Sequence, residues 1–400
     1  MPAALSSRVK PLVSDSDGGR CAAIARVEAF ASLVEAAPVW ERLASGDAVV
    51  TPFADPAWIA AWQRHVGAHG GLSPLIVVAR DGFDAPLALI PFAVRRGRFC
   101  TTAHCFGGSH SHLNMGVWRR DVARTMTAEQ LSALLAEVAA KNGIDLFVLR
   151  NQPLAWDGCD NPLARLGHQP SPDSVYRLEF NHRTGEQVIK HRLKPNLRGL
   201  LKYKERKLQR LDGYRYFRAT TAADVDRVLD AFFLQKATQF ASRGIRDVFS
   251  APGMNAFLRE ACKNGLAEGH PAIELHAIEG GGEVLAVLGG VAGRRRFASM
   301  FNSYTTGEHG KWSPGLIVIT HVIKACADRG LSSFDLGIGY ADYKWYFCKE
   351  IDSLFDSVLA YSPAGRLAAL AWRSAFAARR WIKSTPPLRN ALLMALRAWR

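Results

Sequence analysis

The feature of this sequence that most limits its fold is an internal repeat. The segment from Val77 to Phe99 aligns without gaps with the segment from Leu275 to Phe297. Each copy has an apolar run, an acid-glycine turn, a second apolar run, a basic turn and a third apolar run. Apolar runs separated by such turns indicate antiparallel strands. Chance can produce one such pattern, but its recurrence in the same order predicts a duplicated structure.

In both copies a helix and a further strand follow the three strands. The helices are expected at 128–141 and 316–327, and the strands at 145–149 and 333–339. We therefore predict an α/β (α+β) protein of two tandem halves, each a mixed, mostly antiparallel sheet flanked by helices. The predicted ranges are a disordered tail at 1–25, a first half at 26–185, a basic linker helix at 186–214, a second half at 215–360 and basic amphipathic helices at 361–400.

Composition narrows the class of protein. A chain of 400 residues with 48% apolar content can bury a substantial core. Its seven cysteines are an odd number without CxxC pairs, so neither a disulfide framework nor a metal site is expected. The same cysteine pattern fits a reducing, cytoplasmic compartment. No leader-like run and no apolar run of about 18 residues is present, which predicts a soluble or peripheral protein. The net charge of +15 predicts an anionic partner.

The segment from Gly310 to Leu316 predicts a glycine-rich loop that leads into a helix. Ser313 can accept hydrogen bonds from free amides, and Pro314 suits the first helical position. A helix start presents N–H groups that bind anions, although a Ser-Pro-Gly start is also ordinary capping chemistry. The corresponding loop of the first copy, 119–124, lacks Ser-Pro-Gly. The second half is therefore the better candidate for a cofactor site.

Polar and aromatic residues follow the last strand of the second copy. We expect proton-transfer groups among them, because functional side chains gather at strand ends in α/β folds. The candidates are Asp335, Tyr340, Asp342 and Tyr343, with Lys344 as an acceptor-binding or charge-stabilising group. Asp335 lies within the strand, so it can equally cap a neighbouring backbone. His321 is expected to be a core histidine rather than a base.

Four sequence blocks resemble a known family over roughly residues 50–350. They are Pro52-Phe53 with Trp58 and Trp62, the basic segment 194–210, Ser313-Pro314-Gly315, and Phe334 to Gly337 followed by Tyr343-Lys344. The pattern resembles the GNAT acyltransferases, most closely the CelD-like cellulose-biosynthesis acetyltransferases, and is distantly similar to Fem-type peptidyltransferases. It departs from the family at Gly339-Tyr340-Ala341-Asp342, where a Gly-Asp/Glu pair is usual.

The resemblance implies acetyl-CoA or another acyl-CoA as co-substrate and an amine or hydroxyl of an envelope polysaccharide precursor or related metabolite as acceptor. It implies a pyrophosphate site at the amides of 313–316 and a splayed strand end that grips the pantetheine arm. The implied cofactor-binding residues are Asn302, Ser303, Tyr304, Lys311, Trp312, Ser313, Pro314, Gly315 and Leu316. Two alternatives stay open: a Fem-type aminoacyl-tRNA-dependent ligase, and a catalytically inactive protein that binds a membrane surface.

Acceptor binding is expected from His110, His112 and Asn114 in the first half, and from Lys194 and Arg198 in the basic segment. This segment predicts a helix capped by Asn196. Its apolar stripe consists of Leu197, Leu200, Leu201, Leu208 and Leu211. A solvated linker is the alternative to substrate attraction, but Lys204 falls on the stripe, which solvation does not explain.

Residues 363–400 contain no Asp or Glu. Arg366, Arg373 and Arg380 alternate there with Trp372, Trp381 and Trp399, and two helices broken at Pro386-Pro387 are expected. A basic, aromatic, amphipathic segment of this kind can lie peripherally on the anionic inner face of a membrane. Packing against the protein body is the competing account.

Overall fold

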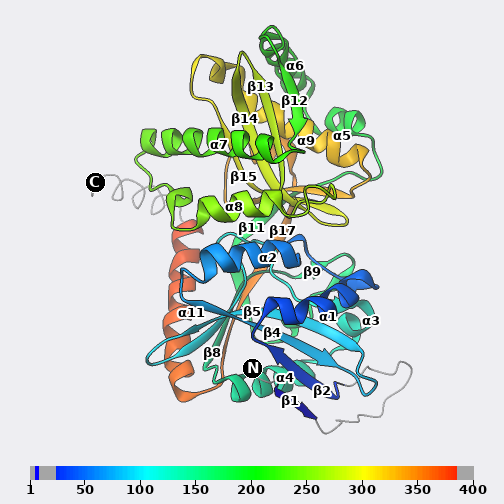
Figure 1. The fold of residues 1–400 in the computed structure, drawn as a ribbon, viewed down its shortest axis with the longest axis vertical. Helices are drawn as coiled ribbons and strands as arrows, with labels where there is room; N and C mark the ends of the chain where they lie inside the picture. The colour runs from blue at the N-terminus through cyan, green and yellow to red at the C-terminus, as the bar shows by residue number, and fades with distance from the viewer. Residues whose placement is uncertain (1–4, 9–23, 385–400) are drawn as a thin grey trace. The chain divides into compact units, whose positions relative to one another are not determined.

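The computed structural model describes residues 5–8 and 24–384 (Figure 1). Most of the predicted tail, the Pro386-Pro387 break and Trp399 lie outside these residues. The described chain forms two compact units: unit 1 contains the residues up to Asp173 and those from Ser353 onward, and unit 2 contains Ser174–Asp352.

Unit 1 is built on a mostly antiparallel sheet with the strand order β1-β2-β4-β5-β6-β8-β17. The strands are β1 (Leu5–Arg8), β2 (Arg26–Phe30), β4 (Leu72–Arg80), β5 (Pro86–Arg96), β6 (Thr101–Cys105), β8 (Leu146–Pro153) and β17 (Glu350–Ala360). Strand β7 (Val117–Arg119) pairs with β5, and β3 (Ala48–Val49) pairs with β7. The helices are α1 (Leu33–Ser45), α2 (Pro56–Trp62), α3 (Arg120–Thr125), α4 (Ala128–Asn142) and α11 (Pro363–Ser384). Leu5–Arg8 is thus a strand within the range predicted as a tail.

Unit 2 repeats this plan with the strand order β11-β16-β15-β14-β13-β12. The strands are β11 (Gln169–Glu179), β12 (Arg215–Arg218), β13 (Glu274–Gly280), β14 (Glu283–Ala292), β15 (Arg296–Tyr304) and β16 (Ser333–Ile338). The helices are α5 (Gly185–Arg192), α6 (Pro195–Leu208), α7 (Ala222–Ser242), α8 (Met254–Lys263), α9 (Pro314–Asp328) and α10 (Lys344–Phe347).

The predicted duplication is confirmed by strand pairing. Strands β4, β5 and β6 form an antiparallel meander, and β13, β14 and β15 form the equivalent one. Each meander ends in a parallel pair across a helical connection, β6 with β8 and β15 with β16. The predicted α/β class with mixed, mostly antiparallel sheets is therefore correct.

The two units exchange their last strands along the chain. Strand β11 follows the first repeat, yet its residues from Val175 onward pair with β16 of unit 2. Strand β17 follows the second repeat, yet Leu354–Ala360 pair with β8 of unit 1. Each added strand covers the edge that the parallel pair would otherwise expose. The repeat alone does not predict this exchange.

The basic segment predicted as a linker packs inside unit 2. Leu193, Leu201 and Leu208 belong to the same buried cluster as the apolar side of α9. Leu200, by contrast, is 47% exposed. Lys194 occupies the N-cap position and Pro195 the first turn, so α6 begins before the predicted cap at Asn196. The stripe therefore fixes α6 against the helix that carries the candidate anion site.

Candidate active site

The start of α9 is the first part of the candidate site. The loop before it is wound into a 3₁₀ helix, η5 (Glu308–Trp312), and Ser313 then adopts a left-handed φ of 55°. Ser313 makes no side-chain cap bond, so the expected capping role of its hydroxyl is wrong. Instead, the ammonium of Lys204 on α6 donates to Ser313 Oγ at 2.8 Å. A cation is therefore held at the helix end that favours anions.

The backbone amides at this helix start are largely used within the chain. Ser313 N donates to Gly310 O, and the amides of Leu316 and Ile317 both donate to Ser313 O, at 3.0 and 3.3 Å. Pro314 has no N–H. Within the described chain, the Gly315 amide donates to no protein acceptor. Of the amides at 313–316 that were expected to bind an anion, only that of Gly315 is therefore available. The helix dipole favours an anion at the same position.

Lysines and aromatic rings surround this helix start. Lys207 Nζ lies 5.2 Å from the centroid of the Tyr203 ring, and that ring meets Trp312 edge to face. Lys311 Nζ lies 5.4 Å from the Trp312 centroid and 3.5 Å from a Glu308 carboxylate oxygen. Helix α6 thus adds two lysines, Lys204 and Lys207, to the one that the loop supplies.

Strands β15 and β16 diverge beside the helix start. Their parallel pairing covers only Arg296–Ala298 against Ser333–Asp335, whereas β15 remains paired with β14 as far as Tyr304. The predicted splay is therefore present, and it leaves backbone groups of β15 facing away from β14. Asn302 Nδ2 donates to the Tyr343 hydroxyl at 3.3 Å across this opening.

Two glutamines of α7 hold the end of β15. The buried Ser303 hydroxyl donates to Gln235 Oε1 at 2.6 Å, and Gln239 Nε2 donates to the Tyr304 carbonyl at 2.8 Å. The Ser303 side chain is thus structural, although its backbone lies at the splay. The Tyr304 ring covers Gly315 so closely that a Cβ added there would lie 2.8 Å from Tyr304 Cδ1. A glycine is therefore required beneath this ring.

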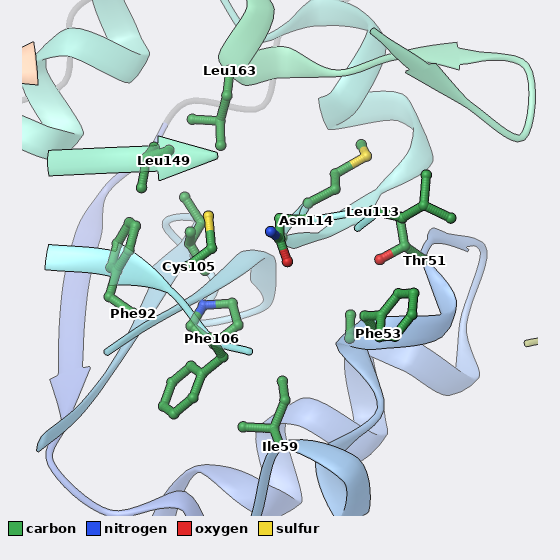
Figure 2. Close-up of a pocket in the computed structure, with 15 residues that line it drawn as sticks. Thr51, Phe53, Ile59, Phe92, Cys105, Phe106, Leu113, Asn114, Leu149 and Leu163 are labelled. Carbon is green, nitrogen blue, oxygen red and sulfur yellow. The ribbon is translucent and has the colours of Figure 1, made fainter. Parts of the chain in front are cut away.

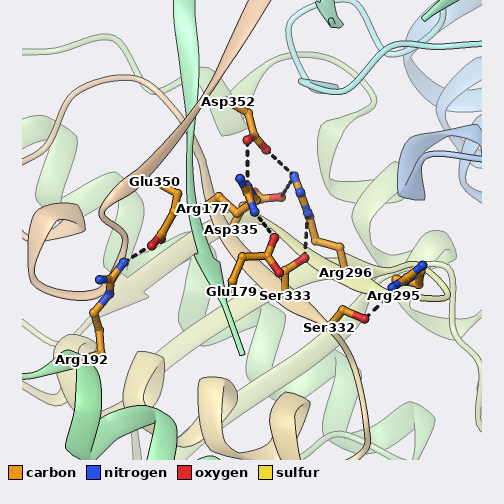
Figure 3. Close-up of polar contacts among 10 residues, drawn as sticks. All are labelled: Arg177, Glu179, Arg192, Arg295, Arg296, Ser332, Ser333, Asp335, Glu350 and Asp352. Atoms are coloured by element: carbon orange, nitrogen blue, oxygen red, sulfur yellow. Dashed lines mark hydrogen bonds and ion pairs between the residues drawn. The ribbon is translucent and has the colours of Figure 1, made fainter. Parts of the chain in front are cut away.

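Asp335 lies in a buried ionic network rather than in an open site (Figure 3). Its Oδ1 accepts from the Gly337 amide at 2.9 Å, and its Oδ2 lies 4.0 Å from Arg296 Nη1. The Arg296 side chain also binds Asp352 at 2.9 Å and Ser333 at 3.1 Å. Asp352 in turn binds Arg177, which also pairs with Glu179. The backbone-capping alternative for Asp335 fits this geometry better than catalysis.

The residues after β16 occupy different environments. Lys344 is 6% exposed, and its ammonium donates to the Ile338 and Gly337 carbonyls at 2.8 and 3.3 Å. Tyr340 is 62% exposed and donates to Asp342 at 2.6 Å. Tyr343 faces the splay through its bond to Asn302, and burial raises the pKa of its phenol. Among the predicted proton-transfer groups, Tyr343 is the one placed at the splay.

A hydrogen bond between a histidine and a glutamate links α9 to α6. His321 Nε2 lies 2.5 Å from Glu205 Oε1, and the imidazole stacks on Tyr216. Burial alone would raise the pKa of Glu205, but its hydrogen bond and charge interaction with His321 lower it. His321 is thus a half-buried histidine that pairs with Glu205, rather than the core histidine expected. Because Glu205 adjoins Lys204, the pair also fixes the lysine at the helix start.

The equivalent region of unit 1 is closed. Helix α4 starts with a capping box in which Thr127 and Gln130 satisfy each other's backbone amides. Where β6 and β8 diverge, a cavity of about 20 Å³ remains, lined in part by Cys105, Leu113 and Leu149 (Figure 2). A single water occupies roughly 10–15 Å³ by the same measure, so this cavity has room for water and not for a substrate.

The acceptor residues predicted in unit 1 make internal contacts. Asn114 lines the small cavity, accepts from Ser111 Oγ and donates to the Arg150 carbonyl. His110 Nδ1 accepts from Trp62 Nε1 at 3.1 Å, and His112 packs against Phe53. Burial lowers the pKa of His110. Their role in acceptor binding stays a prediction.

The other two predicted acceptor residues lie on unit 2. Lys194 is the N-cap residue of α6, and Arg198 Nη1 donates to the Lys190 carbonyl. They therefore belong to a different unit from His110, His112 and Asn114. The sequence does not single out three residues that lie near the candidate site, Lys207, Gln235 and Gln239. Lys207 is only one of many basic residues in its segment, and a glutamine inside a long helix has no distinguishing sequence pattern.

A comparison with protein families matches part of this chain. Residues 195–345 match the family model for the acetyltransferase (GNAT) domain, a range that runs from the start of α6 to the residue after Lys344. No curated protein matches this chain. The CelD-like assignment is not confirmed.

Two solved structures with TM-scores above 0.5 share the fold at low identity, and a third is less similar. FemX has a TM-score of 0.57 at 10% identity, covering 85% of this chain and 99% of that chain. A conserved protein of unknown function from Bacteroides thetaiotaomicron VPI-5482 has a TM-score of 0.51 at 11% identity, covering 82% and 97%. A tandem GNAT protein from the clavulanic acid biosynthesis pathway has a TM-score of 0.44 at 11% identity, covering 84% and 99%.

Proposed function

We propose that the GNAT-type acetyltransferase domain of unit 2 uses acyl-CoA as its acyl donor, bound at the start of α9 and along the splay between β15 and β16. The observation that carries this proposal is the contrast between the two helix starts. The start of α4 is closed by its own capping box, whereas the start of α9 lacks a side-chain cap and has Lys204 beside it. Phosphate oxygens match such a site in charge and in hydrogen-bonding capacity.

The reaction is the transfer of an acyl group from the CoA sulfur to an amine or hydroxyl. The acceptor atom forms a bond to the thioester carbonyl carbon, the C–S bond breaks, and the acceptor's proton is released while the thiolate gains one. Tyr343 is our candidate for the second proton step because its hydroxyl lies at the splay, beside Asn302, and a phenol is protonated at neutral pH. Asp335 is unsuited to the first, since it is held by Gly337 and faces Arg296.

For the acceptor we propose an envelope polysaccharide precursor or related metabolite, on the basis of the family resemblance alone. We favour an acceptor amine over a hydroxyl, so that the acyl group is transferred to nitrogen. We also propose that the protein is cytoplasmic. The exposed basic side of α5 and α6, which includes Lys190 and Lys202, would suit an anionic acceptor. The same charge supports the Fem-type alternative, in which these helices would contact tRNA phosphates.

Thermal stability in the presence of each donor separates these functions. Acetyl-CoA, longer acyl-CoAs, free CoA and aminoacyl-tRNA are added in turn to the full chain, and the unfolding temperature is measured. A donor present at about one hundred times its Kd should stabilise the fold by about 2.7 kcal/mol. Stabilisation by one of the acyl-CoAs supports the proposal. Stabilisation by aminoacyl-tRNA alone would replace it with the Fem-type ligase, and no response to any donor would favour the inactive binding protein.

A further inference from the structure

Helix α11 has one face that packs against unit 1. Ala369 and Phe376 are 3% and 5% exposed, and the Arg150 guanidinium lies 5.5 Å from the Phe376 ring centroid. Arg373 donates to the Val358 carbonyl at 3.0 Å, and Arg379 pairs with Asp173 at 3.0 Å. The helix is therefore held on the body along this side (Figure 1).

The other face of α11 presents large apolar side chains to solvent. Leu367 is 73% exposed, Leu370 62% and Trp381 62%. At about 3.6 residues per turn, positions three and fourteen residues after Leu367 fall on the same side of the helix. The exposed Ser374 and Ala378 lie between them on this side and are small. The result is a largely apolar face interrupted only by the small Ser374, and soluble surfaces rarely leave such a face uncovered.

Charge indicates what covers this face. Residues 363–400 contain no Asp or Glu, and the exposed Arg366 lies next to Leu367. Beyond the described residues, the sequence continues with Arg389, Arg397 and Arg400 and still no acid. An apolar face with a tryptophan and basic neighbours is complementary to a bilayer surface that contains acidic lipids. Within the described chain, no helix is long and apolar enough to cross a membrane.

We propose that the face formed by Leu367, Leu370, Ser374, Ala378 and Trp381 binds the surface of an anionic bilayer. The helix lies in the headgroup region with this face inward, while its opposite face keeps its contacts with unit 1. The proposal is independent of the acyl-CoA site, because none of these residues belongs to unit 2.

The test measures co-flotation of the full chain with vesicles. One set is phosphatidylcholine alone, and the other contains phosphatidylglycerol as well. Wild-type protein should float with the anionic vesicles, more weakly with the neutral ones, and less at high salt. The triple variant L367S/L370S/W381S should bind the anionic vesicles at least about tenfold more weakly. The control F83S/F99S removes two other exposed rings of unit 1, 95% and 82% exposed, and should bind like wild type.

Three results would overturn the proposal: absence of wild-type binding to anionic vesicles, unchanged binding of the triple variant, or equal loss in the control. Light scattering tests whether a second copy of this chain covers the face instead. A dimeric wild type and a monomeric triple variant would assign the face to that second copy. If the triple variant does not fold, the single variant L370E places a negative charge on the same face at a 62% exposed position. It must also lose binding.

Discussion

Lys204 should make a larger contribution to donor binding than any other lysine on α6. Its ammonium is half-buried and already lies 2.8 Å from Ser313 Oγ at the start of α9. A hydrogen bond from such a charged group contributes about 1.5–3 kcal/mol. Since about 1.4 kcal/mol corresponds to a factor of ten, Lys204→Met should weaken CoA binding by roughly ten- to a hundredfold.

Lys202→Met is the matched control for this prediction. It removes the same charge from the same helix, but Lys202 is exposed and lies two residues away, on a different side. Isothermal titration calorimetry with CoA measures both variants at one ionic strength. The expected result is a loss confined to Lys204→Met. Equal losses in the two variants would mean that only the overall charge of +15 attracts the donor, and unchanged binding in Lys204→Met would refute the assignment of this helix start.

Three further predictions test other parts of the account. Gly315→Val should displace the Tyr304 ring and abolish CoA binding, whereas Gly199→Val, where an added Cβ meets nothing within 4 Å, should leave the CoA Kd unchanged; equal Kd values would contradict the role of the ring. Thr127→Val should cost about 1 kcal/mol of unfolding free energy by breaking the α4 capping box, without any effect on CoA titrations. Burial would raise the pKa of Glu274, but hydrogen bonds from His276 and Arg329 lower it from 4.5 to about 2, so about 3 kcal/mol of stability should be lost as the pH falls through that range. Denaturant unfolding should show this acid sensitivity reduced in Glu274→Gln and retained in the exposed-site control Glu283→Gln.

The duplicated fold was predictable because its signal is local. Acid-glycine and basic turns between apolar runs specify a meander, and the same runs recur at Val77 and Leu275. The exchange of β11 and β17 was not predictable, because both strands have 11 residues that mix polar with apolar side chains, and only tertiary pairing decides which sheet each one joins.

The start of α9 was predictable in position, but its hydrogen bonds were not. Ser313-Pro314-Gly315 marked the correct helix start, and the Lys204 side chain among leucines was the one anomaly that pointed to α6. The sequence could not show that η5 and Ser313 use most of the amides, since this depends on the left-handed φ of Ser313. Nor could it show that Asp335 and Lys344 are held internally, because their partners, Arg296 and the carbonyls at the end of β16, are set by tertiary structure.

Hydrogen–deuterium exchange with and without acyl-CoA tests the central claim most directly. The measurement compares peptides that cover the start of α9, near Gly315, with peptides that cover the start of α4, near Thr127. Acyl-CoA should slow exchange at the first and leave the second unchanged. Protection at the start of α4, or none at the start of α9 under saturating donor, would contradict the proposed acyl-CoA site.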